Sequence, residues 1–191
     1  MTPLLTGKTI AFLTANEGVE QIELQHPWNA LRAMGAHTVL LAPEPGFVHA
    51  FHHLDRADRF PVDLRTTDAA ATDYHALVLP GGVANPDILR RDPATHRLLR
   101  EAHHARIPIA AICHGPWTLI DAGLVTGRTI AAWPSLATDL TNAGATWTTD
   151  GVHTDGDLIT AQGIDDVEEF TQALISAVAH RTAHVVDRRS A

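Results

Sequence analysis

The 191-residue chain contains one cysteine, no strongly basic segment and no long apolar run. A single cysteine cannot form an internal disulfide, and the first eight residues lack the basic and apolar regions of a signal peptide. A membrane-spanning helix needs about 20 consecutive apolar residues, and no stretch approaches that length. We therefore expect a protein of the reducing cytoplasm with no membrane partner.

Positive charge is also scarce, because the formal net charge is −8 at pH 7. Binding to nucleic acid requires a basic stripe that neutralises phosphates, so no nucleic-acid partner is expected. Small molecules and proteins remain as substrates. With 45% hydrophobic residues the chain can bury a substantial core, which predicts one domain over residues 1–191 with a frayed tail at 182–191.

Short apolar runs alternate with amphipathic segments along the chain, which predicts strands alternating with helices. We expect strands at 9–14, 37–42, 76–79, 108–112, 129–131 and 158–160. We expect helices at about 19–34, 93–105, 118–122, 135–143 and 165–178. Residues 43–72 are less regular and contain a hairpin or excursion near residues 51–55. This order predicts a parallel sheet with helices on both faces.

The cysteine, Cys113, ends the apolar run 108–112 and is followed by His114, Gly115 and Pro116. Such a run is typical of a buried parallel strand, and the Gly-Pro pair indicates a sharp turn into a helix. A thiol at that corner is lifted toward solvent, and the amides that open the helix lower its pKa. The alternative is a small buried hydrophobe, but the strand, the corner and the adjacent histidine favour a nucleophile.

Ligands of parallel α/β sheets bind at the carboxyl ends of the strands. Three loops, 17–23, 81–87 and 113–117, should therefore converge at one edge of the sheet. Trp28, Trp117 and Trp133 lie near these loops in sequence and are candidates for an aromatic wall, although a large aromatic is more often part of the core.

The thirteen histidines invite a metal hypothesis, which the pattern disfavours. The pairs 52–53 and 103–104 are adjacent residues that point in different directions, and no zinc-binding spacing accompanies them. We expect no metal and no other cofactor. The histidines at 52 and 53 are candidates to line a pocket.

Four blocks occur in order: Phe12–Glu17, Val19–Leu24 with Pro27, Leu77–Gly82 and Ala111–Pro116. With later segments at 127–128, 142–145 and 155–160, they resemble the PfpI-type intracellular cysteine peptidase and deglycase family, in the glutamine amidotransferase-like superfamily. The resemblance covers nearly the whole chain. It implies a flavodoxin-like three-layer α/β sandwich, a mostly parallel central sheet and a nucleophile elbow at Cys113. It also implies a homodimer or larger assembly with the site near a subunit contact.

The resemblance places the nucleophile at Cys113 and its histidine partner at His114. The acidic residue that orients the histidine corresponds to Asp87 and comes from an adjacent subunit in the family. Aspartate is shorter than the glutamate of some members, which affects its reach. The alternative is that Asp87 is a cap or first-turn residue of the following helix.

Glu23 corresponds to the family glutamate that approaches the thiol. A protonated carboxyl there would donate to a thiolate, so its pKa should be raised. The alternative is a solvated first-turn glutamate. The amides of Gly82 and His114 are the expected oxyanion donors, since Gly81 and Gly82 let the backbone approach a substrate. Trp117 is expected to contact the substrate.

The resemblance implies a cysteine-dependent stress-response hydrolase that acts on small carbonyl, acyl or peptide substrates. Deglycase, glyoxalase and peptidase chemistry all begin with thiolate attack, so the nucleophile alone does not separate them. The alternative is a non-catalytic redox sensor or chaperone-like stress protein in which Cys113 is oxidised. Amide transfer from glutamine is disfavoured, because 153–155 is a poor substitute for the histidine and carboxylate that it needs.

Overall fold

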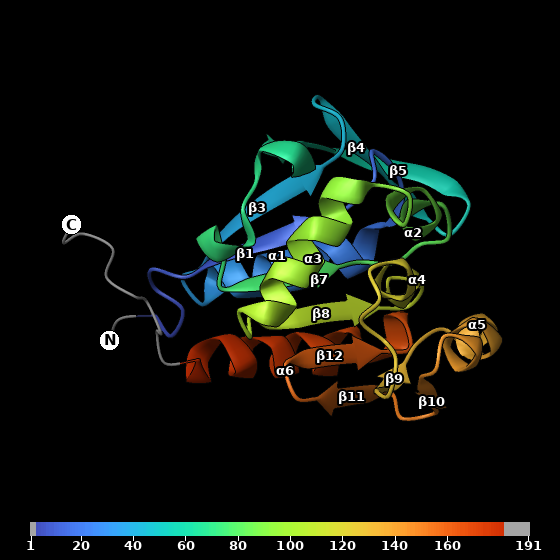
Figure 1. The fold of residues 1–191 in the computed structure, drawn as a ribbon. Helices are drawn as coiled ribbons and strands as arrows, with labels where there is room; N and C mark the ends of the chain where they lie inside the picture. The colour runs from blue at the N-terminus through green and yellow to red at the C-terminus, as the bar shows by residue number, and fades with distance from the viewer. Residues whose placement is uncertain (1–2, 182–191) are drawn as a thin grey trace.

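The computed structural model describes residues 3–181, so the predicted frayed tail at 182–191 lies outside the described residues. A seven-stranded sheet forms the centre of the molecule, in the order β11-β12-β8-β7-β1-β3-β6 (Figure 1). Every neighbouring pair is parallel except the edge pair of β11 and β12. The strands are β1 Thr9–Leu13, β3 His37–Ala42, β6 Leu64–Arg65, β7 Ala76–Leu79, β8 Ile109–Ile112, β11 Val152–Asp155 and β12 Leu158–Ala161.

Helices cover both faces of this sheet, as the alternating pattern predicts. One hydrophobic cluster joins the sheet to α1 and α6, and a second joins the opposite face to α2, α3, α4 and α5. The helices are α1 Gln21–Ala33, α2 Ala84–Leu89, α3 Pro93–His104, α4 Pro116–Asp121, α5 Ala137–Asn142 and α6 Val167–His180. The predicted flavodoxin-like α/β sandwich with a mostly parallel sheet is confirmed. No helix within residues 3–181 has the length and apolar character needed to cross a bilayer.

The two-sided covering explains the sequence of the central strands. All four residues of β7 and all four of β8 are buried, so neither strand has a polar face. In β1, Ala11 and Leu13 belong to one cluster, while Ile10 and Phe12 belong to the other. Continuous apolar runs are therefore what this position in the sheet requires.

Two smaller sheets flank the central one. Residues 47–61 form the expected hairpin, in which β4 Phe47–His52 and β5 Asp55–Pro61 pair antiparallel around a turn at 53–54. β2 Glu17–Glu20 adds to this hairpin in parallel, and β9 Thr129–Ala131 pairs with β10 Thr146–Thr148. The sequence did not predict β2, β6, β10 or β11. Four short 3-10 helices occur at Thr66–Asp68, Ala71–Asp73, Pro134–Leu136 and Ile164–Asp166.

Candidate active site

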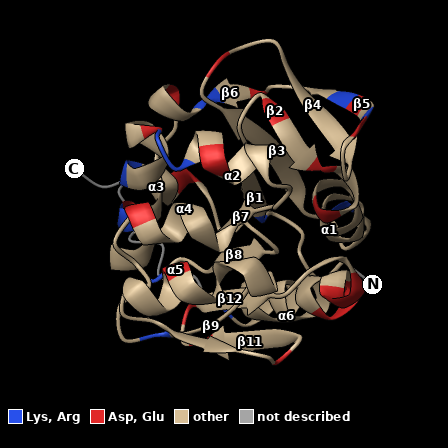
Figure 2. Cartoon of the chain, turned by 90° about the vertical axis from the view of Figure 1, so that its right-hand side faces the viewer, with Lys and Arg blue, Asp and Glu red and all other residues tan. Residues whose placement is uncertain are grey.

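The three predicted loops meet at the carboxyl ends of the parallel strands, the edge that faces the viewer in Figure 2. Cys113 lies at the turn between β8 and α4 with φ +61°, a left-handed conformation that non-glycine residues rarely adopt. Its N–H donates to the carbonyl oxygen of Ala161 at 2.9 Å, and its own carbonyl accepts from the Trp133 N–H at 3.0 Å. Backbone bonds on both sides therefore hold Cys113 in a conformation that costs about 1–3 kcal/mol.

The predicted exposure and low pKa of the Cys113 thiol are wrong. Cys113 is 8% exposed, and burial raises the pKa of the thiol above its ordinary value, with the Glu23 carboxylate adding to the rise. The backbone N–H groups of Gly82 and His114 hydrogen-bond the sulfur and oppose that rise. The amides reach the sulfur as expected, but they lower the pKa of the thiol by less than burial raises it.

Glu23 lies in the first turn of α1 and is completely buried. Its Oε2 accepts a hydrogen bond from the Gly81 N–H at 2.8 Å, while the carboxyl also faces Cys113. Its Oε1 has no partner among residues 3–181 apart from that thiol. Burial raises the pKa of Glu23 from 4.5 to about 7, against the lowering effect of the Gly81 bond. The predicted rise is confirmed, and the solvated alternative is excluded.

His114 bridges the thiol and a residue that the sequence did not identify. Its Nδ1 lies 3.2 Å from Cys113 Sγ, and its Nε2 lies 3.3 Å from Ser135 Oγ. Burial lowers the pKa of His114, which favours the neutral imidazole at pH 7. If Nδ1 accepts the thiol proton, then Nε2 carries the hydrogen and donates it to Ser135.

Two aromatic rings hold the imidazole from its sides. The Trp133 ring stacks on His114 at 5.9 Å and 27°, and the Trp117 ring lies at the same distance with a 60° tilt. Trp117 is itself fixed, because its Nε1 donates to Asp139 Oδ2 at 2.6 Å. Trp28, in contrast, packs on Phe12 at 5.2 Å in the core of the α1 face. The predicted aromatic wall thus consists of two tryptophans, and Trp28 has a core position.

The segment that carries Ser135 follows β9, which pairs with β10 outside the main sheet. The Trp147 Nε1 donates to the carbonyl oxygen of Ala132 at 3.2 Å, which anchors this segment beside the site. Nothing in the sequence distinguishes this serine from other loop serines. Its place depends on a three-dimensional path that no local pattern encodes.

Asp87 occupies the first turn of α2 and is exposed. Within residues 3–181 its side chain makes no hydrogen bond or ion pair, with His114 or with any other residue. This position fits the first-turn alternative. A contact with His114 of a second subunit stays a prediction.

Gly81 and Gly82 bring backbone against the thiol. A Cβ on Gly81 would lie 2.6 Å from Glu23 Oε2 and 2.7 Å from the Cys113 Cβ. Gly82 has φ +79°, and a Cβ there would collide with the Gly18 carbonyl oxygen. Only glycine therefore fits at these positions.

A cavity of about 510 Å³ adjoins this site, lined by Gly18, Phe51, His53, Leu54, Val83, Ala84, Asp87 and Trp117. Trp117 belongs both to its wall and to the surroundings of His114. Gly18 connects it to the Gly82 loop. Of the two histidines expected to line a pocket, His53 does so and His52 does not.

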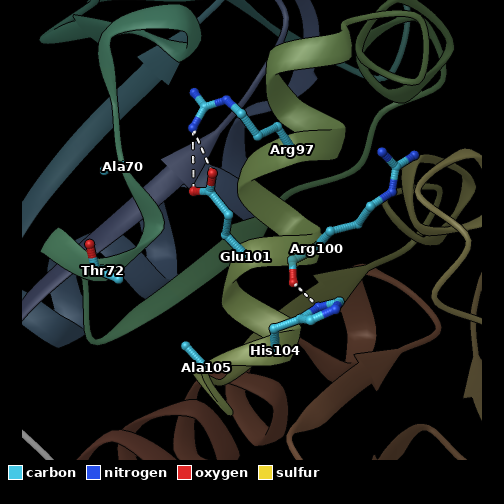
Figure 3. A pocket seen from close by; sticks show the side chains of 7 residues that line it. All are labelled: Ala70, Thr72, Arg97, Arg100, Glu101, His104 and Ala105. Carbon is cyan, nitrogen blue, oxygen red and sulfur yellow. Dashed lines mark hydrogen bonds and ion pairs between the residues drawn. The ribbon is translucent and has the colours of Figure 1, made fainter.

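A larger hollow of about 780 Å³ lies on the face of α3, lined by Ala70, Thr72, Arg97, Arg100, Glu101, His104 and Ala105 (Figure 3). Arg97 is paired with Glu101 at 3.1 Å and donates to two backbone carbonyls. Figure 3 shows Arg100 pointing away from that pair. This hollow thus offers no convergent free groups, and residues 3–181 contain no cluster of three metal-binding side chains.

A flavodoxin-like α/β protein whose only thiol follows a central strand, beside a histidine and a buried glutamate, is the class defined by this fold and site. The chain belongs to the DJ-1/PfpI family, whose family model matches residues 8–177. It is 33% identical over 166 residues to a Bacillus subtilis (strain 168) protein named "Putative cysteine protease YraA", covering 87% of this chain and 95% of the relative.

Two solved structures show the same fold. The DJ-1/ThiJ/PfpI-like part of a two-domain Anabaena variabilis protein, which also has a ferritin-like domain, superposes with a TM-score of 0.83 at 31% identity. That match covers 96% of this chain and 52% of the other. Drosophila melanogaster DJ-1beta superposes with a TM-score of 0.81 at 25% identity, covering 90% of each chain.

Proposed function

We propose that this protein is a cysteine hydrolase that attacks small carbonyl or acyl substrates with Cys113. The observation that carries the proposal is the buried cluster of one thiol, one carboxyl with a pKa of about 7 and one neutral imidazole. Perturbed ionisable groups that face one another are typical of catalytic sites. The name of the B. subtilis relative agrees with cysteine chemistry.

The first step is removal of the thiol proton, because only the thiolate is a strong nucleophile. Glu23 and His114 both face the sulfur, and the carboxylate is the stronger base because burial raises its pKa and lowers that of the imidazole. A base with a pKa near the working pH is suited to this task. Glu23 therefore accepts the proton as substrate enters.

The thiolate sulfur then forms a bond to the substrate carbonyl carbon, and the π electrons move to the carbonyl oxygen. The amides of Gly82 and His114, which already hydrogen-bond the sulfur, stabilise that oxyanion. The proton held by Glu23 passes to the leaving group as its bond breaks. Water, with His114 as base, hydrolyses the resulting thioester and returns the thiol.

Deglycase, glyoxalase and peptidase reactions all begin with this thiolate attack, but only an acyl substrate such as a peptide has the leaving group that leads to the thioester, so the substrate requires experiment. Methylglyoxal, a glycated thiol and a peptide should be assayed with one pure preparation and with its Cys113→Ser variant. We expect turnover of at least one substrate, and its loss in the variant, because serine oxygen is a much weaker nucleophile without a matched base. Retention of more than a few per cent of the rate would contradict the proposal, provided circular dichroism shows an intact fold.

The redox-sensor alternative has less support from the site. A sensor thiol is typically exposed and has a low pKa, whereas Cys113 is 8% exposed and burial raises its pKa. Intact-mass spectra after graded peroxide would decide between the two. Sulfinate formation at low peroxide without turnover of any substrate would favour the sensor.

We further propose a homodimer or larger assembly in the reducing cytoplasm, where a free catalytic thiol persists, and a role in the stress response. Leu54, Val83 and Ile88 support an assembly, because these apolar side chains are 92%, 58% and 46% exposed at the edge that carries the site. Contacts between subunits commonly bury such side chains.

A further inference from the structure

Asn85, the second residue of α2, is a completely buried amide behind the loop that follows β7. Its Nδ2 donates to the carbonyl oxygens of Pro80 and Gly81 at 2.9 and 3.0 Å, and its Oδ1 accepts from the Ala15 N–H at 2.7 Å. The opposite orientation of the amide would place its oxygen against two carbonyls and its nitrogen against an N–H. Only the observed orientation therefore gives both amide hydrogens and the oxygen a partner.

The two carbonyls that this amide holds belong to the peptide groups that point into the candidate site. Both peptide bonds are trans, so the N–H of each group is directed opposite to its C=O. The Pro80 carbonyl shares its peptide plane with the Gly81 N–H, which donates to Glu23 Oε2 at 2.8 Å. The Gly81 carbonyl shares its plane with the Gly82 N–H, which hydrogen-bonds the Cys113 sulfur. The amide thus holds one side of each peptide group whose other side contacts a reacting side chain.

The loop needs such a restraint, because two consecutive glycines allow a backbone many conformations. A Cβ at either glycine would collide with neighbouring atoms, so no side chain of the loop itself can supply the restraint. The Glu20 N–H also donates to the Gly81 carbonyl, at a longer 3.3 Å. Through the Ala15 N–H, Asn85 fastens the same loop to the turn after β1. All of these contacts lie inside one chain, so they are present with or without an adjacent subunit.

We infer that Asn85 is a positioning residue that aims the Gly81 N–H at the base Glu23 and the Gly82 N–H at the oxyanion. The inference rests on the proposed function, because it assigns both N–H groups to catalysis by the hydrolase. The three hydrogen bonds of the Asn85 side chain all go to the backbone, so it acts on the reaction through the loop. Donors that are fixed before the reaction stabilise developing charge most effectively.

Asn85→Ala removes both donors, and the Glu23 carboxyl reports the effect. With 13C-labelled glutamate, NMR follows the carboxyl that titrates at about pH 7, and its absence in Glu23→Gln assigns the signal. The Gly81 bond lowers the Glu23 pKa, so its loss should raise the midpoint by roughly one pH unit, as expected for one hydrogen bond to a charged group. At about pH 9, where Glu23 is mostly ionised in both proteins, kcat should fall roughly tenfold or more with little change in KM.

Asn85→Ser separates the two peptide groups. A serine hydroxyl in a helix can donate to the carbonyl four residues earlier, which here is the Gly81 carbonyl. The Gly82 N–H should then regain its direction, whereas the Pro80 carbonyl, one residue further back, stays without this donor. We therefore expect Asn85→Ser to recover much of kcat at about pH 9, while the Glu23 midpoint stays raised.

Thr95→Val is the matched control for stability. It removes a buried hydroxyl that donates to Asp92 at 2.7 Å at the start of α3, so it should lower the unfolding midpoint and change neither kcat nor the Glu23 titration. Circular dichroism establishes that each variant is folded.

An unchanged Glu23 midpoint in folded Asn85→Ala, or equal changes in Thr95→Val, would overturn the inference. So would Asn85→Ser that is no more active than Asn85→Ala. If neither Asn85 variant folds, the amide serves stability and the inference also fails. The NMR titration needs no turnover, so failure of the proposed function appears separately, as the absence of turnover of any substrate.

Discussion

At the residue scale, the candidate site pairs two buried acidic groups, the Cys113 thiol and the Glu23 carboxyl. Burial makes both the Cys113 thiolate and the Glu23 carboxylate costly, so each pKa is raised. Only one of the two needs to hold a charge at a time. In the proposed mechanism a proton moves from the thiol to Glu23 during attack, and the Glu23 pKa of about 7 suits this exchange near neutral pH.

Ionisation of Glu23 should set the pH dependence of activity. The Cys113-dependent rate should rise with pH around a midpoint of about 7, because the carboxylate is the base and burial raises its pKa to that value. Glu23→Gln should lower kcat by roughly a hundredfold or more and remove that midpoint. A pH–rate profile of both proteins provides the measurement, and an identical midpoint in the variant would assign it to another group.

The same carboxyl should make stability depend on pH. Below pH 4.5 Glu23 is neutral in both the folded and the unfolded protein, so its burial does not reduce the free energy of unfolding. As pH rises from 4.5 to about 7, the unfolded chain loses the proton while the fold keeps it, which removes about 3 kcal/mol. Glu23→Gln should lack this loss. Urea unfolding of both proteins at pH 4 and pH 8 measures the difference, and parallel changes would show that Glu23 is not coupled to folding.

Ser135 should act on catalysis through His114 alone. Ser135→Ala removes the group 3.3 Å from Nε2, so kcat should fall about three- to tenfold with little change in KM. Ser135→Thr keeps the hydroxyl and should restore most of the rate. Unfolding midpoints control for structure, because this side chain is exposed and should contribute little stability. A rise in KM with unchanged kcat would instead mean that Ser135 contacts substrate.

At the scale of elements, the glycine loop, Gly81 and Gly82 between β7 and α2, sets how closely the backbone approaches the thiol. In Gly81→Ala the new Cβ would meet Glu23 and Cys113 at 2.6 and 2.7 Å, so the loop or the thiol must shift. We expect loss of more than tenfold in activity and about 1–3 kcal/mol in stability. Gly156→Ala in the β11–β12 turn is the control. It meets nothing within 4 Å but has φ +64°, so it should lose stability and keep activity. Equal activities would show that the loop tolerates a side chain.

The sequence predicted best the elements that are buried on both faces. β1, β7 and β8 follow from apolar runs, and α3 begins at Pro93 with the Asp92 side chain accepting from the Ala94 and Thr95 amides, as the Asp-Pro pair indicates. β2, β6 and β10 have only two to four residues, and their pairing depends on distant segments. No local pattern could specify them.

The same limit applies to the candidate site. Cys113, Glu23 and the glycine loop follow from strand ends and from resemblance to the family. Ser135 and the raised pKa of Cys113 do not, because both depend on how distant segments enclose the turn after β8. Burial, the dominant influence on the thiol, is a property of the assembled layers.

For the whole molecule, assembly of subunits is the expectation with the largest consequence. Ile88 is 46% exposed on α2, next to the cavity wall but outside it. Ile88→Asp should therefore weaken a homodimer about tenfold or more, since burial of such a side chain contributes about 1.5–3 kcal/mol. Met34→Asp, at a 38% exposed position beyond the end of α1, should leave assembly unchanged. Sedimentation velocity over a concentration series measures both, and a wild-type monomer at all concentrations would refute the dimer.

Dilution of the wild-type protein then tests whether the contact serves the site. Leu54 and Val83 line the cavity and are 92% and 58% exposed in one chain, so a second subunit that covers them would exclude water from the bound substrate. Activity per subunit should consequently fall as the protein is diluted through the dissociation range. The Ile88→Asp variant should show the same fall at a higher protein concentration, because its dimer is weaker. Constant activity per subunit while sedimentation shows dissociation would mean that each chain carries a complete site, and that no residue of a second subunit, Asp87 included, takes part.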